Sequence, residues 1–291
     1  MYLNRIKFEN LPYYEELVSK SNDIYQFRAE YEQLQDLEFD SLSYLSDGYK
    51  IFAYLIKPKD SKKKLPCIIY NRGGNRDFSG LSSKLVINSL SKIASKGFII
   101  IASSYRGNKK SEGKDEFGGD DINDVLQLIS LLEEIPNADT KNIGMYGWSR
   151  GGLMTYISLT KTNKIKTAVI GGSPTDMFDL IRERPAFEKS VLEEMIPYYE
   201  FNREMELLKR SPIKWINKLP RIPLLIIHGE NDDRVSATHA VNISKELTKE
   251  NFPHKLVIFK NSNHNISEHR GELNDLIINW FLYHLSLNTS N

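Results

Sequence analysis

The residue with the clearest chemical potential is Ser149, in the segment Gly147-Trp-Ser-Arg-Gly151. A serine flanked by glycines two residues away, after an apolar strand and before a helix, is typical of a nucleophile elbow. The turn is so tight that side chains at Gly147 and Gly151 would collide, and it points the Arg150 backbone N–H toward the reacting centre. The spacing therefore predicts a serine nucleophile, with Arg150 supplying one oxyanion amide. A structural serine in a glycine-rich turn is the alternative.

Two later loops could supply the base and the acid that a serine nucleophile needs. The apolar strand expected at 222–227 runs into a loop with Asp232, and the strand at 255–259 runs into a polar loop with His264. A histidine removes the proton of the serine, and a carboxylate fixes the tautomer of that histidine. The chain order serine, aspartate, histidine is one of the known orders. We therefore predict Ser149, Asp232 and His264 as a catalytic triad.

Other residues near these loops compete for the same roles. Asp233 and Glu230 are rivals of Asp232 for the acid. A metal site built from His228, Glu230, Asp232 and His264 is also conceivable. The catalytic roles already account for these residues without an ion, so neither a metal nor an organic cofactor is expected.

The six histidines differ in their expected positions. His264 alone follows the last strand on a loop, and His269 is its competitor one helical turn further on. His228 ends a strand before a glycine and is expected to be packed and hydrogen-bonded. The others are expected at the surface or an interface: His239, His254 and His284.

The second oxyanion donor is expected from the loop after the first parallel strand. Gly73, Gly74 and Asn75 lie there, and glycines let the backbone turn its N–H groups inward. An ordinary Gly-Gly turn is the alternative. The substrate pocket is expected to include five further residues: Arg72, Trp148, Phe178, Tyr198 and Tyr199.

The elements that must position these residues alternate between strand and helix. After a hairpin at 42–56 with a turn at Asp47-Gly48, the expected strands cover 66–70, 97–102, 142–146, 167–170, 222–228 and 255–259. Helices are expected near 81–95, 121–134, 151–160, 237–250 and 267–285. These strands are apolar throughout, as strands buried on both faces are. The pattern predicts an α/β domain with about eight mostly parallel strands and helices on both faces, whose ligands bind at the carboxyl ends of the strands.

Two segments fall outside this alternation. Residues 1–39 have apolar spacing that suggests helices, and we expect a helical extension that serves as a dimer arm or as part of a cap. The domain proper then covers 40–291. About 50 residues, at 173–220, separate the expected strands at 167–170 and 222–228. A connection between parallel strands needs far fewer residues. We expect this insertion to form a small helical cap over the active site; helices packed at the side are the alternative.

Composition narrows the function classes. Lys and Arg number 39 against 38 Asp and Glu, so the net charge of +1 gives no general attraction to nucleic acid or membrane surfaces. No apolar run approaches the roughly 18 residues that span a bilayer, and the N-terminus lacks the apolar core of a signal peptide. Cys67 is the single cysteine, expected in a buried strand, and it can form no internal disulfide. A cytoplasmic protein is expected.

From about Asp40 to the C-terminus, the chain resembles the catalytic domain of the prolyl oligopeptidase family of serine hydrolases. The resemblance rests on Ser104-Tyr-Arg-Gly107, Phe117-Gly-Gly-Asp-Asp-Ile-Asn-Asp-Val125, Gly147-Trp-Ser-Arg-Gly-Gly152, Ser211-Pro212, His228-Gly-Glu-Asn-Asp-Asp-Arg-Val235 and Asn263-His264. It implies an α/β-hydrolase fold, Asp232 as the triad acid, and a second oxyanion amide from Gly73, Gly74 or Asn75. Relatives often carry histidine where this chain has Arg72, which leaves that donor open.

The resemblance also bears on substrate size. Large peptidases of this family carry an N-terminal β-propeller, which would need about 300 residues, whereas only about 40 precede the domain here. We therefore predict a serine hydrolase without that size filter, acting on a short peptide or a small ester through an acyl-enzyme. The alternatives are a carboxylesterase or thioesterase on small acyl substrates, and a non-catalytic ligand-binding protein with the same fold. No nucleic-acid or membrane partner is expected, and the oligomeric state stays open.

Overall fold

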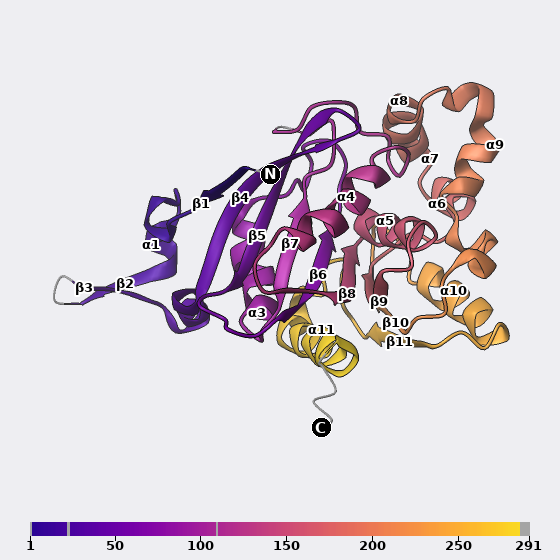
Figure 1. The fold of residues 1–291 in the computed structure, drawn as a ribbon. Coiled ribbons are helices and arrows are strands. Elements are labelled where there is room, and N and C mark those ends of the chain that lie inside the picture. The colour runs from indigo at the N-terminus through magenta and orange to yellow at the C-terminus, as the bar shows by residue number, and fades with distance from the viewer. Residues whose placement is uncertain (1, 22–23, 109, 286–291) are drawn as a thin grey trace.

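The computed structural model describes residues 2–21, 24–108 and 110–285. Its centre is a nine-stranded sheet with the order β1-β4-β5-β7-β6-β8-β9-β10-β11 (Figure 1). The strands are β1 (Tyr2–Arg5), β4 (Leu37–Ser46), β5 (Tyr49–Pro58), β6 (Leu65–Asn71), β7 (Ile99–Ser103), β8 (Ala138–Trp148), β9 (Ile165–Gly171), β10 (Leu224–Gly229) and β11 (His254–Phe259). From β7 onward all neighbours in the sheet run parallel, and β1, β4 and β5 pair antiparallel. The expected mostly parallel α/β sheet with a hairpin opening is confirmed.

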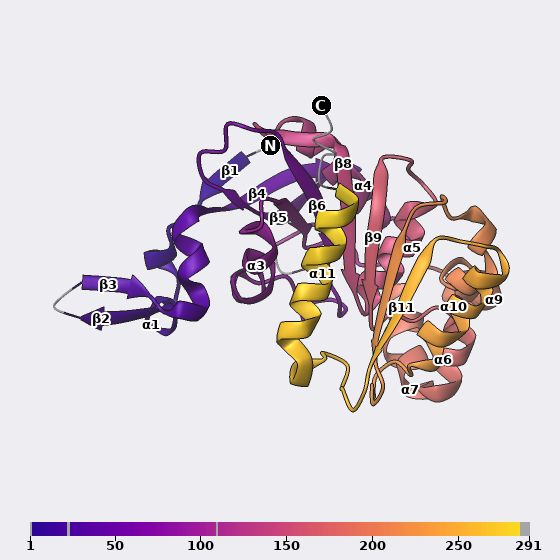
Figure 2. The same ribbon diagram turned by 90° about the horizontal axis from the view of Figure 1, so that it is seen from below.

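Helices cover both faces of the sheet (Figure 2). One core cluster joins the sheet to α4 (Ile122–Glu133), α5 (Arg150–Leu159) and α10 (Thr238–Lys249). The second joins the other face to α3 (Ser91–Ala94) and α11 (Arg270–Leu285). Alternate residues of β6 enter different clusters, Cys67 the first and Ile68 the second. Because each face of the strand is buried, its sequence is apolar at successive positions.

The remaining helices lie outside these two groups. They comprise α1 (Tyr14–Leu17), α2 (Ser83–Leu85), α6 (Met177–Glu183), α7 (Pro185–Phe187), α8 (Glu193–Met195) and α9 (Tyr199–Lys209). Tighter or wider helical turns occur at Phe8–Asn10, Ala29–Asp36, Val86–Leu90, Glu188–Leu192, Pro212–Lys214, Ile216–Lys218 and Ser267–His269. Among the described helices, none is long and apolar enough to cross a bilayer.

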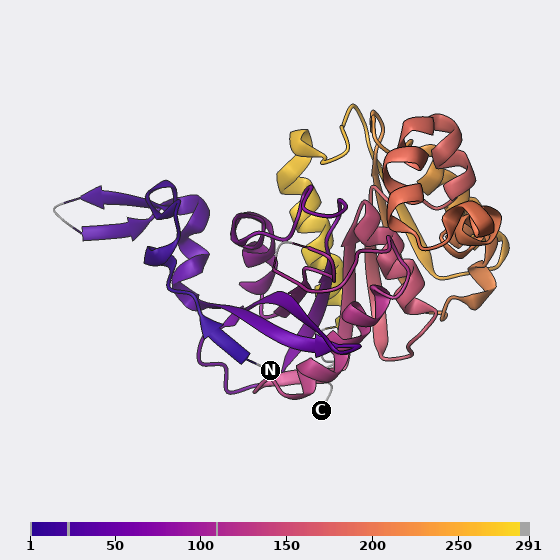
Figure 3. The ribbon, with the colours of Figure 1, turned by 90° about the horizontal axis from the view of Figure 1, so that it is seen from above.

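The N-terminal segment differs from the expected helical extension. Among its described residues, the only α-helix is the single turn α1, while β1 pairs with β4, and β2 (Val18–Ser21) pairs with β3 (Ile24–Phe27) in a separate hairpin. The helix prediction is wrong for the residues of these strands, because β-branched and aromatic residues favour strands once a partner strand completes their hydrogen bonds. Ala29–Asp36 does form a 3-10 helix. The hairpin of β2 and β3 projects away from the sheet (Figure 3). Through β1, residues before 40 are part of the main sheet.

The insertion between β9 and β10 forms α6, α7, α8 and α9, which lie together on the same side of the molecule as α10 (Figure 1). Its apolar residues belong to the same core cluster as the sheet, including Met177, Leu192 and Leu207. We therefore describe it as an integral helical layer, and refer to residues 173–220 as the cap segment.

Candidate active site

Ser149 occupies the sharp turn between β8, which ends at Trp148, and α5, which begins at Arg150. Its backbone has φ 58° and ψ −125°, a conformation that residues other than glycine rarely adopt. The Ser149 N–H donates to the carbonyl of Gly171 on the neighbouring strand at 2.7 Å. The strained turn is thus fixed by the sheet on one side and by the helix on the other.

The two flanking glycines are required by close backbone contacts. A Cβ atom at Gly151 would lie 1.9 Å from the carbonyl oxygen of Asn71. One at Gly147 would lie 2.1 Å from the carbonyl oxygen of Gly151. Both distances are far inside van der Waals contact, so the steric reason for the spacing applies to this chain.

His264 and Asp232 meet at the carboxyl ends of the last two strands. His264 Nδ1 lies 2.6 Å from Asp232 Oδ2, and both side chains are buried. Asp232 Oδ1 also accepts the N–H groups of Arg234 and Val235, each at 2.9 Å. Burial alone would raise the pKa of Asp232, but His228 and His264 together hold that pKa well below its ordinary value. An ionised carboxylate only accepts hydrogen bonds, so Nδ1 carries the proton and Nε2 of His264 is left for another partner.

The competitors for these roles lie elsewhere. His269 contacts Glu272 at 3.1 Å and does not line the cavity that holds Ser149 and His264. Glu230 accepts the N–H of Asn261, and Asp233 is exposed. Within the described ranges, no group of three His, Cys, Asp or Glu side chains is arranged to hold a metal ion.

Two other histidines, His228 and His239, are buried and hydrogen-bonded within the fold. His228 is buried, and its Nε2 lies 2.8 Å from the Val235 carbonyl, as expected of a packed residue. His239 was expected at a surface or interface, but only 2% of it is exposed, and its Nδ1 accepts the Thr175 N–H at 3.2 Å. The reason is that it lies four residues before buried Ile243, on the inner face of α10.

The loop after β6 lies directly against Ser149. Gly73, Gly74 and Asn75 all line the cavity that holds Ser149. A Cβ atom at Gly73 would lie only 3.2 Å from the Ser149 Cβ, which places the loop backbone beside the serine. The Arg150 N–H, at the start of α5, is the other amide close to this centre.

The buried side chain of Arg150 ties the start of α5 to neighbouring residues of the core. Its Nη1 donates to Asp115 at 2.7 Å, its Nη2 contacts Asp121 at 2.5 Å, and its guanidinium lies 4.7 Å from the centre of the Phe117 ring. Burial would raise the pKa of Asp115, but Arg150 lowers it to about 2. Sequence reasoning did not identify Asp115, because nothing in its local sequence shows that the chain returns to Arg150.

Arg72 was expected in the pocket but lies beneath the loop instead. It is fully buried and does not line the cavity. Its guanidinium donates to the backbone carbonyls of Ser104, Gly73 and Arg76 at 3.1, 2.9 and 3.0 Å. A planar group with five donors suits this task of holding a loop by its carbonyls.

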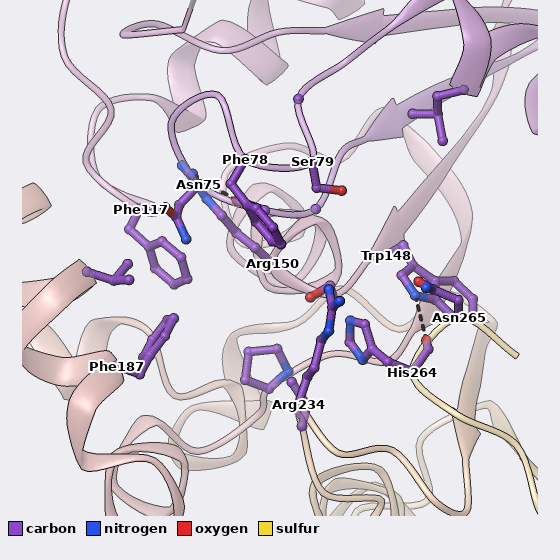
Figure 4. A pocket seen from close by; sticks show the side chains of 18 of the residues that line it. Asn75, Phe78, Ser79, Phe117, Trp148, Arg150, Phe187, Arg234, His264 and Asn265 are labelled. Atoms are coloured by element: carbon purple, nitrogen blue, oxygen red, sulfur yellow. Dashed lines mark hydrogen bonds between the residues drawn. The ribbon is translucent and has the colours of Figure 1, made fainter.

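The cavity has a volume of about 750 Å³ and extends to both sides of His264. Figure 4 shows Phe117 and Phe187 facing each other on one side, and Trp148 and Asn265 on the other. We call these the aromatic arm and the Trp148 arm. Leu180 and Val191 of the cap segment also line the cavity. The cap segment thus contributes side chains to the wall.

The three cap aromatics predicted for the pocket do not line it. Phe178 packs against the core, Tyr198 is 76% exposed, and the buried Tyr199 donates to Glu188 at 2.7 Å. Trp148 does line the cavity, as predicted. The cap segment consists of short helices, and which of their aromatic residues faces the cavity depends on the directions of those helices, which sequence spacing does not specify.

Known proteins share much of this chain's sequence pattern. The model of the prolyl oligopeptidase family matches residues 85–288. The uncharacterized peptidase YtmA of Bacillus subtilis is 28% identical over 214 residues, covering 73% of this chain and 80% of that protein. The acylamino-acid-releasing enzyme of Rattus norvegicus is 23% identical over 270 residues, covering 87% of this chain but 35% of its own length.

A solved structure shows the same fold. The acylaminoacyl peptidase of Pyrococcus horikoshii superimposes with a TM-score of 0.74 at 23% identity. The match covers 89% of this chain and 44% of that one. The chain therefore spans less than half the length of two of these three relatives.

Proposed function

This chain belongs to the prolyl oligopeptidase family, and from that premise we propose that it is a serine hydrolase that forms an acyl-enzyme on Ser149. The observation that carries the proposal is that Ser149 and His264 line one cavity, while buried Asp232 lies 2.6 Å from His264 Nδ1 behind it. We propose that the bond cleaved is a peptide amide or a carboxylic ester. Relatives described as peptidases favour the amide.

The proposed reaction follows the triad scheme. Ser149 Oγ attacks the carbonyl carbon while His264 Nε2 takes its proton, and Asp232 stabilises the resulting imidazolium. The carbonyl oxygen becomes an oxyanion, which accepts hydrogen bonds from the Arg150 N–H and an amide of the Gly73–Asn75 loop. His264 then gives its proton to the leaving group. A water molecule, deprotonated by His264, then attacks the ester of the acyl-enzyme in the same way. The acyl group leaves as a carboxylic acid, and Ser149 regains its proton.

The low pKa of Asp232 supports this role. The carboxylate stays ionised throughout the range in which an imidazole titrates, so it can hold the Nδ1 proton before and after each transfer. The apolar walls of the aromatic arm, including Phe187 and Val191, suit an acyl group with an apolar side chain.

A fluorophosphonate probe tests the proposal directly. We expect the folded wild-type protein to be labelled at Ser149, and Ser149→Ala to show neither labelling nor hydrolysis. Ser173→Ala is the matched control, because this buried serine lies next to the elbow but is not placed in the reaction. Absence of an adduct on Ser149 in folded wild-type protein would contradict the proposal.

The choice between amide and ester needs a second assay. Initial rates on p-nitrophenyl acyl esters and on peptide anilides, with Ser149→Ala as the background, separate a peptidase from an esterase. We expect both to be cleaved at the same serine, with the anilides showing the larger dependence on the acyl residue. Hydrolysis of esters alone would assign the chain to the esterases.

A further inference from the structure

The charged side chains that line the cavity are all positive. Among the residues that line it are four arginines and no aspartate or glutamate. Arg150 is already paired with Asp115 and Asp121. The other three, Arg184, Arg234 and Arg270, form no ion pair with any residue in the described part of the chain. An anion in this cavity would therefore meet uncompensated positive charge.

One of these arginines acts on two tyrosines of the Trp148 face of the sheet, since Tyr70 and Tyr146 share a core cluster with Trp148 and both feel the charge of Arg270. We assign this polar group to the Trp148 arm. Arg270, the first residue of α11, and Asn274 one turn later line the cavity together with Tyr70 and Tyr146. The two tyrosine rings stand on neighbouring strands, with centroids 5.1 Å apart. No described residue is a hydrogen-bond partner of either hydroxyl, and both tyrosines line the cavity. Two phenol donors and one guanidinium are thus available to a ligand.

The pKa values of the phenols agree with this arrangement. Burial raises the pKa of Tyr70 to about 12, although the nearby charges of Arg72 and Arg270 act to lower it. Burial also raises the pKa of Tyr146 well above its ordinary value, again against the charge of Arg270. Both hydroxyls are therefore protonated donors at neutral pH, and the Arg270 charge is close enough to act at the same place.

The position of the arm relative to His264 indicates which part of a substrate it takes. Trp148 Nε1 donates to the His264 carbonyl at 3.1 Å, which fixes the wall of this arm to the loop of the general base. The aromatic arm opens on the opposite side of His264 (Figure 4). An acyl group in the aromatic arm leaves the Trp148 arm for the departing amine, which must receive its proton from His264.

We propose that the Trp148 arm binds the free carboxylate of a short leaving group, so that the preferred substrates are short peptides cut one or two residues before their C-terminus. This inference rests on the proposed function. In the step itself the acyl carbon–nitrogen bond breaks and the serine ester bond forms. The proton of Ser149 passes through His264 to the leaving nitrogen, while the carboxylate of the departing amino acid or dipeptide stays paired with Arg270.

The test compares peptides that differ only in their terminal charge. N-acetylated di- and tripeptides with alanine, leucine or phenylalanine before the scissile bond are offered with a free C-terminus and as C-terminal amides. We expect wild-type kcat/KM to be about tenfold or more higher for the acids, the size of one well-placed charge pair. Mass spectrometry of the products locates the bond that is cut.

Variants assign the preference to the Trp148 arm. In Arg270→Gln we expect the acid-to-amide ratio to fall to about one, and in Arg270→Lys to be partly retained, because a point charge replaces a bidentate fork. Arg182→Gln, which removes an exposed arginine from α6, is the control and should keep the wild-type ratio. As a measurement that needs no variant, free amino acids should inhibit wild-type protein more strongly than their amides.

The outcomes separate this inference from the proposed function. If Ser149 is labelled but acids and amides react equally, the carboxylate site is wrong while the hydrolase stands. If Arg234→Gln removes the preference and Arg270→Gln keeps it, the carboxylate binds at Arg234 and the inference is equally overturned. Failure to label Ser149 would instead remove the proposed function and this inference with it.

Discussion

At the scale of single residues, the site depends on one strained backbone and one buried carboxylate. The conformation of Ser149 costs on the order of 1–3 kcal/mol and is maintained by its hydrogen bond to Gly171. Asp232 is held by two backbone N–H groups as well as by His264.

The first prediction compares two adjacent aspartates. Asp232→Asn should lower kcat by about 10⁴-fold, because the amide favours the wrong tautomer of His264. Asp233→Asn changes the exposed neighbour and should leave kcat within about twofold. Steady-state kinetics on one p-nitrophenyl ester, with circular dichroism to check folding, make the comparison. Equal rates for the two variants would refute the assignment of Asp232 as the acid.

The second prediction compares two glycines. Gly151→Ala should reduce the free energy of unfolding by about 3 kcal/mol or more, because the new methyl group would meet the Asn71 carbonyl. Gly271→Ala, on α11 with nothing within 4 Å of its added carbon, should be neutral or stabilising by up to about 1 kcal/mol. Urea denaturation measures both. A Gly151→Ala variant as stable as wild type would show that the elbow is looser than described.

At the scale of elements, the parallel strands could be predicted because a strand buried on both faces is apolar in its own sequence. The elbow could also be predicted from local sequence, because glycines at these two positions are required to avoid steric clashes within the turn. Arg72 and Asp115 could not be placed, because their partners Ser104 and Arg150 lie at least 30 residues away along the chain. The N-terminal strands were missed because their partner strand, not their own sequence, stabilises them.

The third prediction concerns Phe187, through which the cap segment lines the aromatic arm of the cavity. Phe187→Ala would open the aromatic arm, so we expect kcat/KM to shift in favour of bulkier acyl groups by about tenfold. Phe201→Ala is the matched control, because Phe201 is 78% exposed on α9 and does not line the cavity. An ester series of increasing acyl size measures the shift. An unchanged profile in Phe187→Ala would mean that the acyl group lies elsewhere.

Removing the whole cap segment is a poor test of its role. Its apolar side chains are continuous with the core on that face of the sheet, so deletion would expose apolar surface as well as open the site. The single substitution isolates the effect on the substrate from the effect on folding.

At the scale of the whole molecule, acid stability should depend on the ion pair beneath the elbow. Arg150 lowers the pKa of Asp115 to about 2 in the folded protein, so the unfolded chain takes up that proton at higher pH. The contribution of ionised Asp115 to stability is therefore complete above about pH 4 and is lost as the pH falls toward 2.

Asp115→Asn makes this measurable. The variant should be less stable than wild type at pH 6, and the gap in the free energy of unfolding should narrow as the pH falls from about 4 to about 2. Asp275→Asn, on the exposed side of α11, should track wild type throughout. Denaturation curves at a series of pH values test this. A gap that stays constant through that range would contradict the assigned pKa.

The order of strands has a consequence for protein synthesis. The strand that leads to Ser149, the proposed nucleophile, is complete by residue 148, whereas the proposed acid and base lie in the loops after the last two strands. A ribosome-bound chain therefore displays Ser149 well before the imidazole that we propose activates it has been translated. Nascent or prematurely terminated chains should be hydrolytically silent, and a cell would meet the active enzyme only after the final helix has left the exit tunnel.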